Sequence, residues 1–153
     1  MKIEIMPIGY VKNSRKEATD DFWGNVISEI ELTGEFTEEA LKGIEEFSHA
    51  EVIFHFDKAD KNKVNMASRH PRGNTEWPEV GIFVQRGKDR PNHLGHTPVK
   101  ILKREGRVLF VKGLDAIDGT PVIDIKPVVR EFLPSGDIKQ PAWVTELMQD
   151  YWK

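Results

Sequence analysis

Two arginines that flank a turn-rich segment are the first residues whose types and spacing could bind an anion. Arg86 and Arg90 stand four positions apart, and Pro91 and Gly95 follow them. The proline fixes one backbone dihedral angle and the glycine relaxes another. A guanidinium group can donate two parallel hydrogen bonds to a carboxylate or a phosphate. The segment is therefore a candidate anion-binding loop, unless its arginines only pair with carboxylates for structure.

Three carboxylates follow within ten positions, at Asp115, Asp118 and Asp124. They could bind a metal ion, act as acid and base, or accept hydrogen bonds from ribose hydroxyls or an amine. A hard-metal loop needs oxygen ligands at spacings such as Asp-x-Asp-x-Asp-Gly, which this segment does not have. An isolated Asp-Gly usually only forms a turn, but beside an arginine-rich loop the cluster is more suggestive of a site.

The other residues that could carry nucleophilic or metal chemistry give weaker signals. The chain has no cysteine, which excludes a thiolate nucleophile, a disulfide scaffold and a cysteine-based zinc site. His93 and His96 are separated by Leu94-Gly95, which argues against a shared helix face, and no third zinc ligand is evident. Neither a phosphate-binding P-loop nor a Rossmann glycine fingerprint occurs. We therefore predict no bound metal.

Short strand-like runs, separated by turn signals, must position these side chains. Val, Ile and Phe dominate the runs, and several alternate apolar with polar residues. The runs are Ile3–Val11, Val26–Leu32, Glu51–Phe56, Val80–Gln85, Val99–Leu102, Arg107–Val111 and Val122–Ile125. This density of strands predicts a mainly β protein, a small closed or nearly closed β-barrel with a few short helices.

Two of those helices can be placed. Thr37 can cap a helix that begins at Glu38 and runs toward Phe47. Pro141 suits the first turn of a C-terminal helix. Apolar residues repeat along that second helix at helical spacing: Val144, Leu147, Met148 and Tyr151. Such a stripe more often packs on the protein's own core than on a partner.

Length and composition set the class of protein. A chain of 153 residues, 39% hydrophobic and 31% charged, predicts a single domain over residues 1–153 with a sizeable core. No apolar run approaches the roughly 18 residues that span a membrane, and the start lacks the features of a signal peptide. We therefore expect a soluble, cytoplasmic protein that does not enter a membrane.

The charges are unevenly distributed along the chain. The formal net charge is −3, yet residues 69–107 hold nine basic and four acidic side chains, a local charge of +5. Such a segment could present an anion-binding surface, because the field depends on where charges lie as well as on their total. The alternative is a solvated face with compensating charges.

Several short motifs, taken in order and spacing, resemble a known family. They are Pro7-Ile-Gly9, Gly43-Ile-Glu-Glu-Phe-Ser-His49, Arg69-His-Pro-Arg-Gly-Asn74, Val80-Gly-Ile-Phe83, Arg90-Pro-Asn92 with Gly95, and Gly113-Leu-Asp-Ala-Ile-Asp-Gly-Thr-Pro121 continuing to Asp124-Ile-Lys-Pro127. Together they resemble the TsaA-like (TrmO-type) family of S-adenosylmethionine-dependent methyltransferases over about residues 5–130. A C-terminal helical extension, residues 131–153, would follow. The resemblance implies one compact β-barrel domain, assembled as a homodimer, with S-adenosyl-L-methionine bound near the subunit interface.

Motif matching within this resemblance also implies which residues form the sites. Those that would bind the cofactor are Phe22, Trp23, Arg86, His96, Asp115, Ala116, Ile117 and Asp118. The aspartates could accept hydrogen bonds from the ribose or the ammonium group, and Arg86 could bind the carboxylate. Trp23 could stack on adenine or simply pack in the core. Candidates for substrate binding are Arg69, Arg72, Arg90 and Asn92. No residue stands out as the catalytic base.

The resemblance further implies an activity, because characterised relatives methylate N6 of a threonylcarbamoyl-modified adenosine beside the tRNA anticodon. tRNA is then the expected partner. This chain departs from the family pattern at His93, where the family usually has proline, and at Asp57-Lys58, where relatives commonly have His-Gln. These departures leave two further hypotheses. One is methylation of a small-molecule or other non-tRNA acceptor, and the other is a non-catalytic regulator that binds the cofactor.

Overall fold

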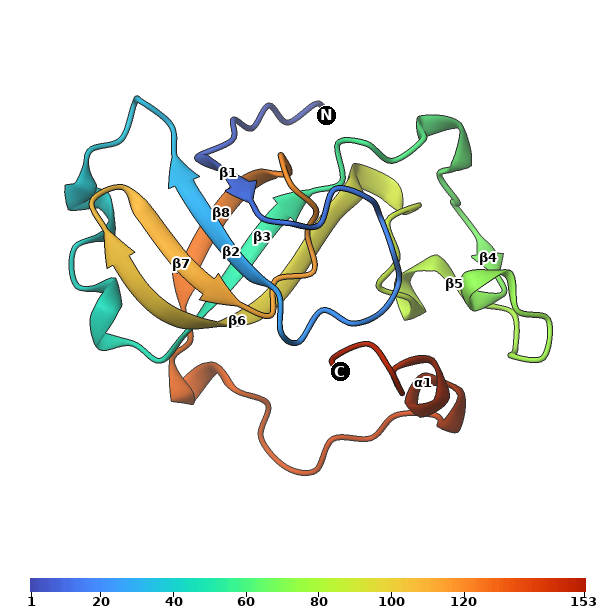
Figure 1. Cartoon of the computed structure of the whole chain (residues 1–153). Helices are drawn as coiled ribbons and strands as arrows, with labels where there is room; N and C mark the ends of the chain where they lie inside the picture. The colour runs from blue at the N-terminus through green and yellow to red at the C-terminus, as the bar shows by residue number, and fades with distance from the viewer.

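Alternating apolar and polar residues build six antiparallel strands, which close into a barrel in the order β1-β2-β7-β6-β3-β8. The computed structural model describes residues 1–153 (Figure 1). The barrel strands are β1 (Gly9–Lys12), β2 (Ile27–Leu32), β3 (His49–His55), β6 (Leu94–Glu105), β7 (Val108–Lys112) and β8 (Pro121–Pro127). The predicted mainly β fold and closed barrel are confirmed.

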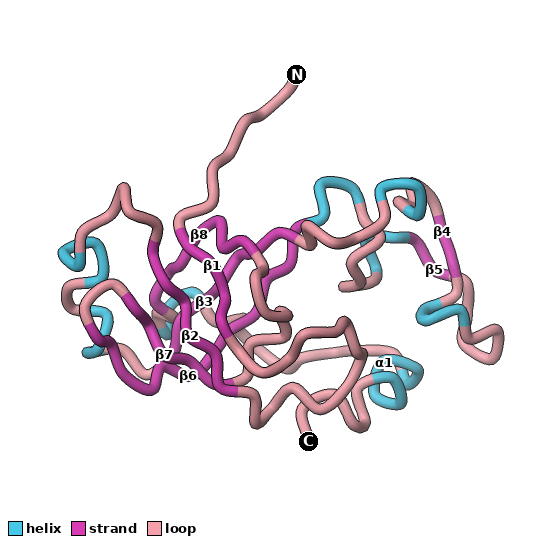
Figure 2. The backbone as a smooth tube through the Cα atoms, turned by 45° about the horizontal axis from the view of Figure 1, so that its top comes forward, coloured by secondary structure: helices cyan, strands magenta, loops and turns pink.

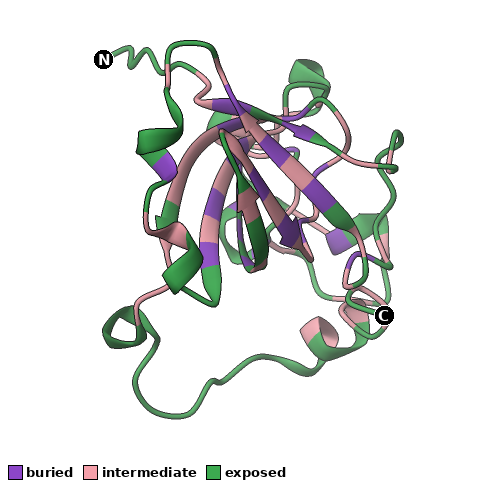
Figure 3. Cartoon of the chain, turned by 60° about the vertical axis from the view of Figure 1, so that its left-hand side comes forward, coloured by how far each residue is buried: buried purple, intermediate pink, exposed green.

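Inward-facing side chains from every strand fill the barrel. Val11, Ile30 and Leu109 lie opposite one another across β1, β2 and β7, and all three are fully buried. Figure 3 shows such buried positions alternating with more exposed ones along the strands. Gly95 in β6 completes the packing, because a Cβ atom there would lie only 2.4 Å from the ring of Phe54. The core thus holds the barrel closed and fixes the loops at its ends.

The predicted first strand is wrong at its N-terminal end. β1 begins at Gly9, and the residues before it form no strand. The side chains of Ile3 and Ile5 are highly exposed, at 76% and 56% for the two residues. Their alternation with polar residues has no sheet face to pack against, because β2 and β8 pair with the chain only from Gly9 onward in this part of the barrel. Alternation of apolar and polar residues therefore does not form a strand here without a neighbouring strand to pair with.

The predicted helix from Glu38 to Phe47 is also wrong as a single element. It divides into two 3₁₀ turns, Glu38–Leu41 and Ile44–Glu46, because Gly43 between them adopts a left-handed conformation with φ of +87°. The C-terminal helix is confirmed as α1 (Ala142–Leu147), with Pro141 at its N-terminal boundary. No helix is both long and apolar enough to cross a bilayer.

Between β3 and β6 the chain leaves the barrel, over residues 56–93. This excursion carries a two-stranded sheet, β4 (Ser68–Arg69) with β5 (Val80–Gly81). The predicted strand Val80–Gln85 therefore ends early and continues as a 3₁₀ turn, Ile82–Val84. Figures 1 and 2 both draw the excursion on the same side of the barrel as α1. One hydrogen bond joins them directly, from Trp77 Nε1 to Glu146 Oε2 at 2.9 Å.

Candidate functional site

Two hydroxyl groups hold the carboxylate of Asp115. Thr97 in β6 donates to one oxygen, and the Tyr151 hydroxyl donates to the other at 2.5 Å. Burial raises the pKa of Tyr151 far above its usual value, and the charge and hydrogen bond of Asp115 raise it further. The hydroxyl therefore stays protonated and donates. Because a carboxylate offers about four lone-pair positions, Asp115 can still accept hydrogen bonds from a ligand.

Arg86 lies near this carboxylate. One of its guanidinium nitrogens donates to the carbonyl of His96, at 2.5 Å, directly before Thr97 in the chain. The positive charges of Arg72 and Arg86 both oppose the rise in the pKa of Tyr151. Arg86 remains exposed, with donors to spare. The structure thus brings together an arginine and an aspartate that the sequence separates by 29 positions.

The side chain of His96 points away from this pair. Burial alternates along β6, so that Thr97 is buried while His96 is exposed on the opposite face. Its Nε2 atom lies 3.6 Å from a carboxylate oxygen of Glu51 in the neighbouring strand β3. His96 therefore takes part in the site only through its backbone carbonyl group. No cluster of three or more histidine, aspartate or glutamate side chains could hold a metal ion.

Asp118 lies in the same loop as Asp115, between β7 and β8, but is held by different partners. Its carboxylate accepts hydrogen bonds from the backbone N–H of Asn13 at 3.0 Å and from Lys16 Nζ at 2.6 Å. The bond from Lys16, followed by that from Asn13, lowers the pKa of Asp118. Asp115 is bonded to Thr97 and Tyr151 instead, so the two aspartates have different surroundings. Between them, Ala116 is buried and accepts a hydrogen bond from the Asn13 side chain, and Ile117 is half-buried.

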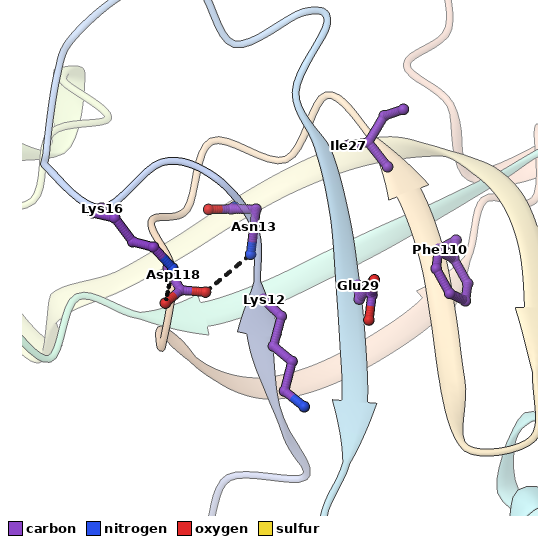
Figure 4. A pocket seen from close by; sticks show the side chains of 7 residues that line it. All are labelled: Lys12, Asn13, Lys16, Ile27, Glu29, Phe110 and Asp118. Carbon is purple, nitrogen blue, oxygen red and sulfur yellow. Dashed lines mark hydrogen bonds and ion pairs between the residues drawn. The ribbon is translucent and has the colours of Figure 1, made fainter.

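An open groove of about 520 Å³ begins beside Asp118 on the outer surface of the barrel. Figure 4 shows its lining side chains, which come from β1, β2, β7 and the adjoining loops. They are Lys12, Asn13, Lys16, Ile27, Glu29, Phe110 and Asp118. This groove lies over strands whose inner faces form the core, and neither Asp115 nor Arg86 lines it. Asp115, its partners Thr97 and Tyr151, and Arg86, here called the Asp115 cluster, bring together candidate residues from distant parts of the chain. Of the candidate residues, the groove contains only Asp118.

The loop between β1 and β2 exposes one aromatic ring and buries another. Trp23 is 3% exposed, its Nε1 atom donates to the Thr19 carbonyl at 3.2 Å, and the Arg15 guanidinium covers its ring at 4.0 Å. Trp23 is thus buried under Arg15, outside the hydrophobic core of the barrel. Phe22 is 59% exposed and has a left-handed backbone with φ of +67°. Phe22 is therefore the ring of this loop that is open to solvent.

Two of the arginines expected at a substrate site brace the excursion instead of pointing freely into solvent. Arg69 donates to Asp89 at 2.9 Å, and Arg90 donates to the Gln85 carbonyl at 2.6 Å. Burial would raise the pKa of Asp89, but the Arg69 hydrogen bond and the nearby Lys88 charge outweigh it and hold that pKa below its usual range. These contacts satisfy donors that a substrate would otherwise use.

Of the remaining substrate candidates, Arg72 contacts the loop that carries Phe22. Arg72 forms a two-pronged contact with the carboxylate of Asp21, at 2.9 and 3.3 Å. It therefore ties the excursion to the β1–β2 loop, next to the Asp115 cluster. Asn92 is exposed and adopts a left-handed backbone with φ of +64°.

Sequence reasoning missed four residues of the site: Asn13, Lys16, Thr97 and Tyr151. Tyr151 was assigned only to an apolar stripe, although a phenol is amphipathic and buried tyrosines usually find a hydrogen-bond partner. Asn13 directly follows a strand, and an asparagine in that position is a turn signal in the sequence. In the structure its side chain accepts a hydrogen bond from the backbone N–H of Arg15. Nothing local marks Thr97 or Lys16.

The comparisons with known proteins decide the family. Residues 19–132 match the family described as the tRNA-methyltransferase O N-terminal domain. The chain belongs to this family. Among its relatives, an S-adenosyl-L-methionine-binding protein of Archaeoglobus fulgidus is 39% identical over 126 residues, which cover 80% of this chain and 86% of that protein. The tRNA (adenine(37)-N6)-methyltransferase of Mus musculus is 40% identical over 95 residues, or 62% of this chain and 22% of that protein.

The fold comparison agrees with the family. The crystal structure of TrmO from P. aeruginosa superposes with a TM-score of 0.75 and 28% sequence identity, covering 94% of this chain and 62% of that one. The chain therefore spans less than two thirds of the length of the TrmO chain and of the mouse protein. It also spans only 34% of a second, longer relative from Archaeoglobus fulgidus.

Proposed function

We propose that this protein is an S-adenosylmethionine-dependent methyltransferase whose cofactor binds at the Asp115 cluster. The observation that carries the proposal is that Arg86 and Asp115 are bonded to adjacent residues of β6, His96 and Thr97, and both keep unused hydrogen-bonding capacity. The loop that carries the exposed Phe22 is bonded through its backbone to Asp150 and Tyr151, and the Tyr151 hydroxyl binds Asp115. The donor and acceptor set fits the ligand, which combines ribose hydroxyls, an ammonium group, a carboxylate and an adenine ring. When bound, the cofactor supplies an electrophilic methyl group.

The chain's own residues have distinct roles in this proposal. Asp115 accepts hydrogen bonds from the ribose hydroxyls or the ammonium group, and the free N–H groups of Arg86 bind the carboxylate. Phe22 covers the flat face of the adenine. Ala116 and Ile117 line the loop that Asp118 fastens to the β1–β2 loop. His96 and Trp23 support the site through backbone and packing contacts. Holding the reactants in line for displacement then provides much of the catalysis.

The acceptor proposed here is the N6 amine of a threonylcarbamoyl-modified adenosine beside the tRNA anticodon. The family supports it, and so does the tRNA (adenine(37)-N6)-methyltransferase activity for which the mouse relative is named. So does the net +5 charge of residues 69–107, nine basic against four acidic, because phosphate contacts dominate binding of nucleic acids. Of the candidate substrate residues, Asn92 and Arg72 lie on the surface that such an acceptor would approach. We further propose that the protein acts as a cytoplasmic homodimer of single-domain chains.

Isothermal titration with S-adenosylmethionine tests the cofactor site. Arg86→Ala and Asp115→Asn should each weaken binding about 10- to 100-fold, the value of one hydrogen bond between charged groups. Arg130→Ala and Asp137→Asn are matched controls, because both residues are exposed and lie in the segment after β8. Unchanged affinity in both site variants would reject the proposed site.

A second experiment tests the acceptor. The protein is incubated with methyl-labelled cofactor and either tRNA carrying the threonylcarbamoyl modification, tRNA lacking it, or a metabolite extract. Label should appear only in the modified tRNA, and tRNA affinity should fall steeply as salt rises. Label in a small metabolite would favour the non-tRNA acceptor. Cofactor binding without transfer to any acceptor would favour the regulator.

A further inference from the structure

The C-terminal residues 142–153, here called the C-terminal strap, are fixed to the loops around the candidate site. At one end, Glu146 accepts the hydrogen bond from Trp77 in the excursion. At the other, the backbone N–H groups of Phe22 and Trp23 donate to the carbonyls of Asp150 and Tyr151, at 3.1 and 2.8 Å. The strap lies beyond residue 132, where the family match ends. It nevertheless bridges two parts of the chain that belong to the family domain.

Gly24 lets the strap approach more closely than any other residue would. A Cβ atom at this position would lie 1.9 Å from the carbonyl oxygen of Trp152. The backbones of the strap and of the β1–β2 loop are therefore in direct contact. Figure 1 shows the red end of the chain next to the blue loop that follows β1. This close packing leaves no room for a side chain between the strap and the loop.

The strap brings the Tyr151 hydroxyl to the Asp115 carboxylate, at 2.5 Å. Thr97 binds the other oxygen, so both carboxylate oxygens have a hydroxyl donor. The Tyr151 ring is itself packed edge-on against the ring of Trp152, with centroids 4.9 Å apart. Without Tyr151, Thr97 would be the only side chain holding this carboxylate, which could then turn toward the guanidinium of Arg86.

We propose that Tyr151 is a positioning residue, delivered by the C-terminal strap, that orients the Asp115 carboxylate so that its remaining lone pairs face the cofactor. This inference rests on the proposed function, because it assigns Asp115 to the cofactor site. It adds to that site a residue from outside the matched family domain. The strap is then part of the binding site and not an appendage to the barrel.

Titration calorimetry with the unreactive product S-adenosylhomocysteine tests the inference. Tyr151→Phe removes only the hydroxyl, and should weaken binding about tenfold, because the bond that it loses has a charged acceptor. Tyr10→Phe is the matched control, since it makes the same chemical change at the only other tyrosine, 44% exposed in β1. This control should bind as tightly as the unsubstituted protein.

A spectroscopic measurement separates positioning from a merely structural role. With ¹³C-labelled tyrosine, the protein has two ring Cζ resonances, which the two phenylalanine variants assign. Saturating S-adenosylhomocysteine should shift the resonance of Tyr151, whose hydroxyl shares Asp115 with the ligand, and leave that of Tyr10 in place. A tyrosine that only stabilised the fold would not respond to the ligand.

The outcomes are distinct. Unchanged or tighter binding by Tyr151→Phe, or an unshifted Tyr151 resonance in the bound protein, would overturn the inference and leave the proposed function standing. If the unsubstituted protein does not bind the ligand, the proposed function and this inference both fall. If Tyr151→Phe does not fold, Trp77→Phe, which releases the strap at its other end, must weaken binding in the same direction. Full affinity in that variant would also refute the inference.

Discussion

Gly24→Ala should detach the C-terminal strap. The new methyl carbon would lie 1.9 Å from the Trp152 carbonyl oxygen, and real contacts of this kind essentially never fall below 3.0 Å. Strap and loop must therefore separate by about 1 Å. Such a shift carries the hydrogen bonds of Phe22 and Trp23 to the strap, at 3.1 and 2.8 Å, beyond normal bonding distance.

The size of the effect follows from the contacts that are lost. A hydrogen bond between neutral groups contributes roughly 0.5–1.5 kcal/mol, and one to a charged group roughly 1.5–3 kcal/mol. Loss of two backbone bonds and of the bond from Tyr151 to Asp115 therefore sets an upper limit of roughly 6 kcal/mol. The measured loss should be smaller, because the strap can detach while the barrel stays folded.

Urea unfolding measures the loss of stability, and limited chymotrypsin digestion measures the detachment of the strap. Gly24→Ala should lower the free energy of unfolding and expose the strap to cleavage at Trp143 and Tyr151. Gly34→Ala is the matched control, because a Cβ atom there has nothing within 4 Å. That control should leave both measurements nearly unchanged. If Gly24→Ala matches the control in stability and in protease resistance, the strap does not pack on Gly24, and the reasoning fails.

Two further predictions concern the loop that follows β1. Asn13→Ala removes the side-chain bond to the buried Ser28 hydroxyl and should cost about 1–3 kcal/mol in urea unfolding, whereas the exposed Asn25→Ala should cost almost nothing. Equal losses in the two variants would contradict the assigned role. The bond from Lys16 lowers the pKa of Asp118 in the folded state, so the stabilisation is complete above the usual carboxyl pKa and disappears as the pH falls through the lowered value. The free energy of unfolding should therefore fall less steeply from neutral to acid pH in Asp118→Asn than in the unsubstituted protein. Parallel curves for the two proteins would refute this.

Much of the fold could be predicted from the sequence, because strands that line a core must alternate. Val11, Ile30 and Leu109 illustrate this, since each is fully buried between two sequence neighbours that are less buried. The same rule failed at Ile3 and Ile5, where alternation continues but no neighbouring strand is available. Alternation specifies a strand only where the sheet provides a partner.

The conformation of Gly43 explains the other error in the fold. The residues around it have the periodicity of a helix, but the left-handed backbone at this position interrupts the element after one turn. A glycine in a helical pattern is compatible with either outcome. The second turn, Ile44–Glu46, lies against β6, and that contact is not visible in the sequence.

At the candidate site, the sequence by itself determined the kinds of groups: a guanidinium in a turn-rich loop, carboxylates beside a turn and a pair of aromatic rings. Only the tertiary structure decided which of them remain available to a ligand. It covers the Trp23 ring with Arg15, ties Asp118 to Lys16 and bonds Arg86 to the His96 carbonyl, next to Thr97. It also brings Tyr151 to Asp115 across 36 positions of chain. Side-chain chemistry is a property of each residue, whereas its free hydrogen-bonding capacity depends on the partners that barrel closure and strap packing bring within reach.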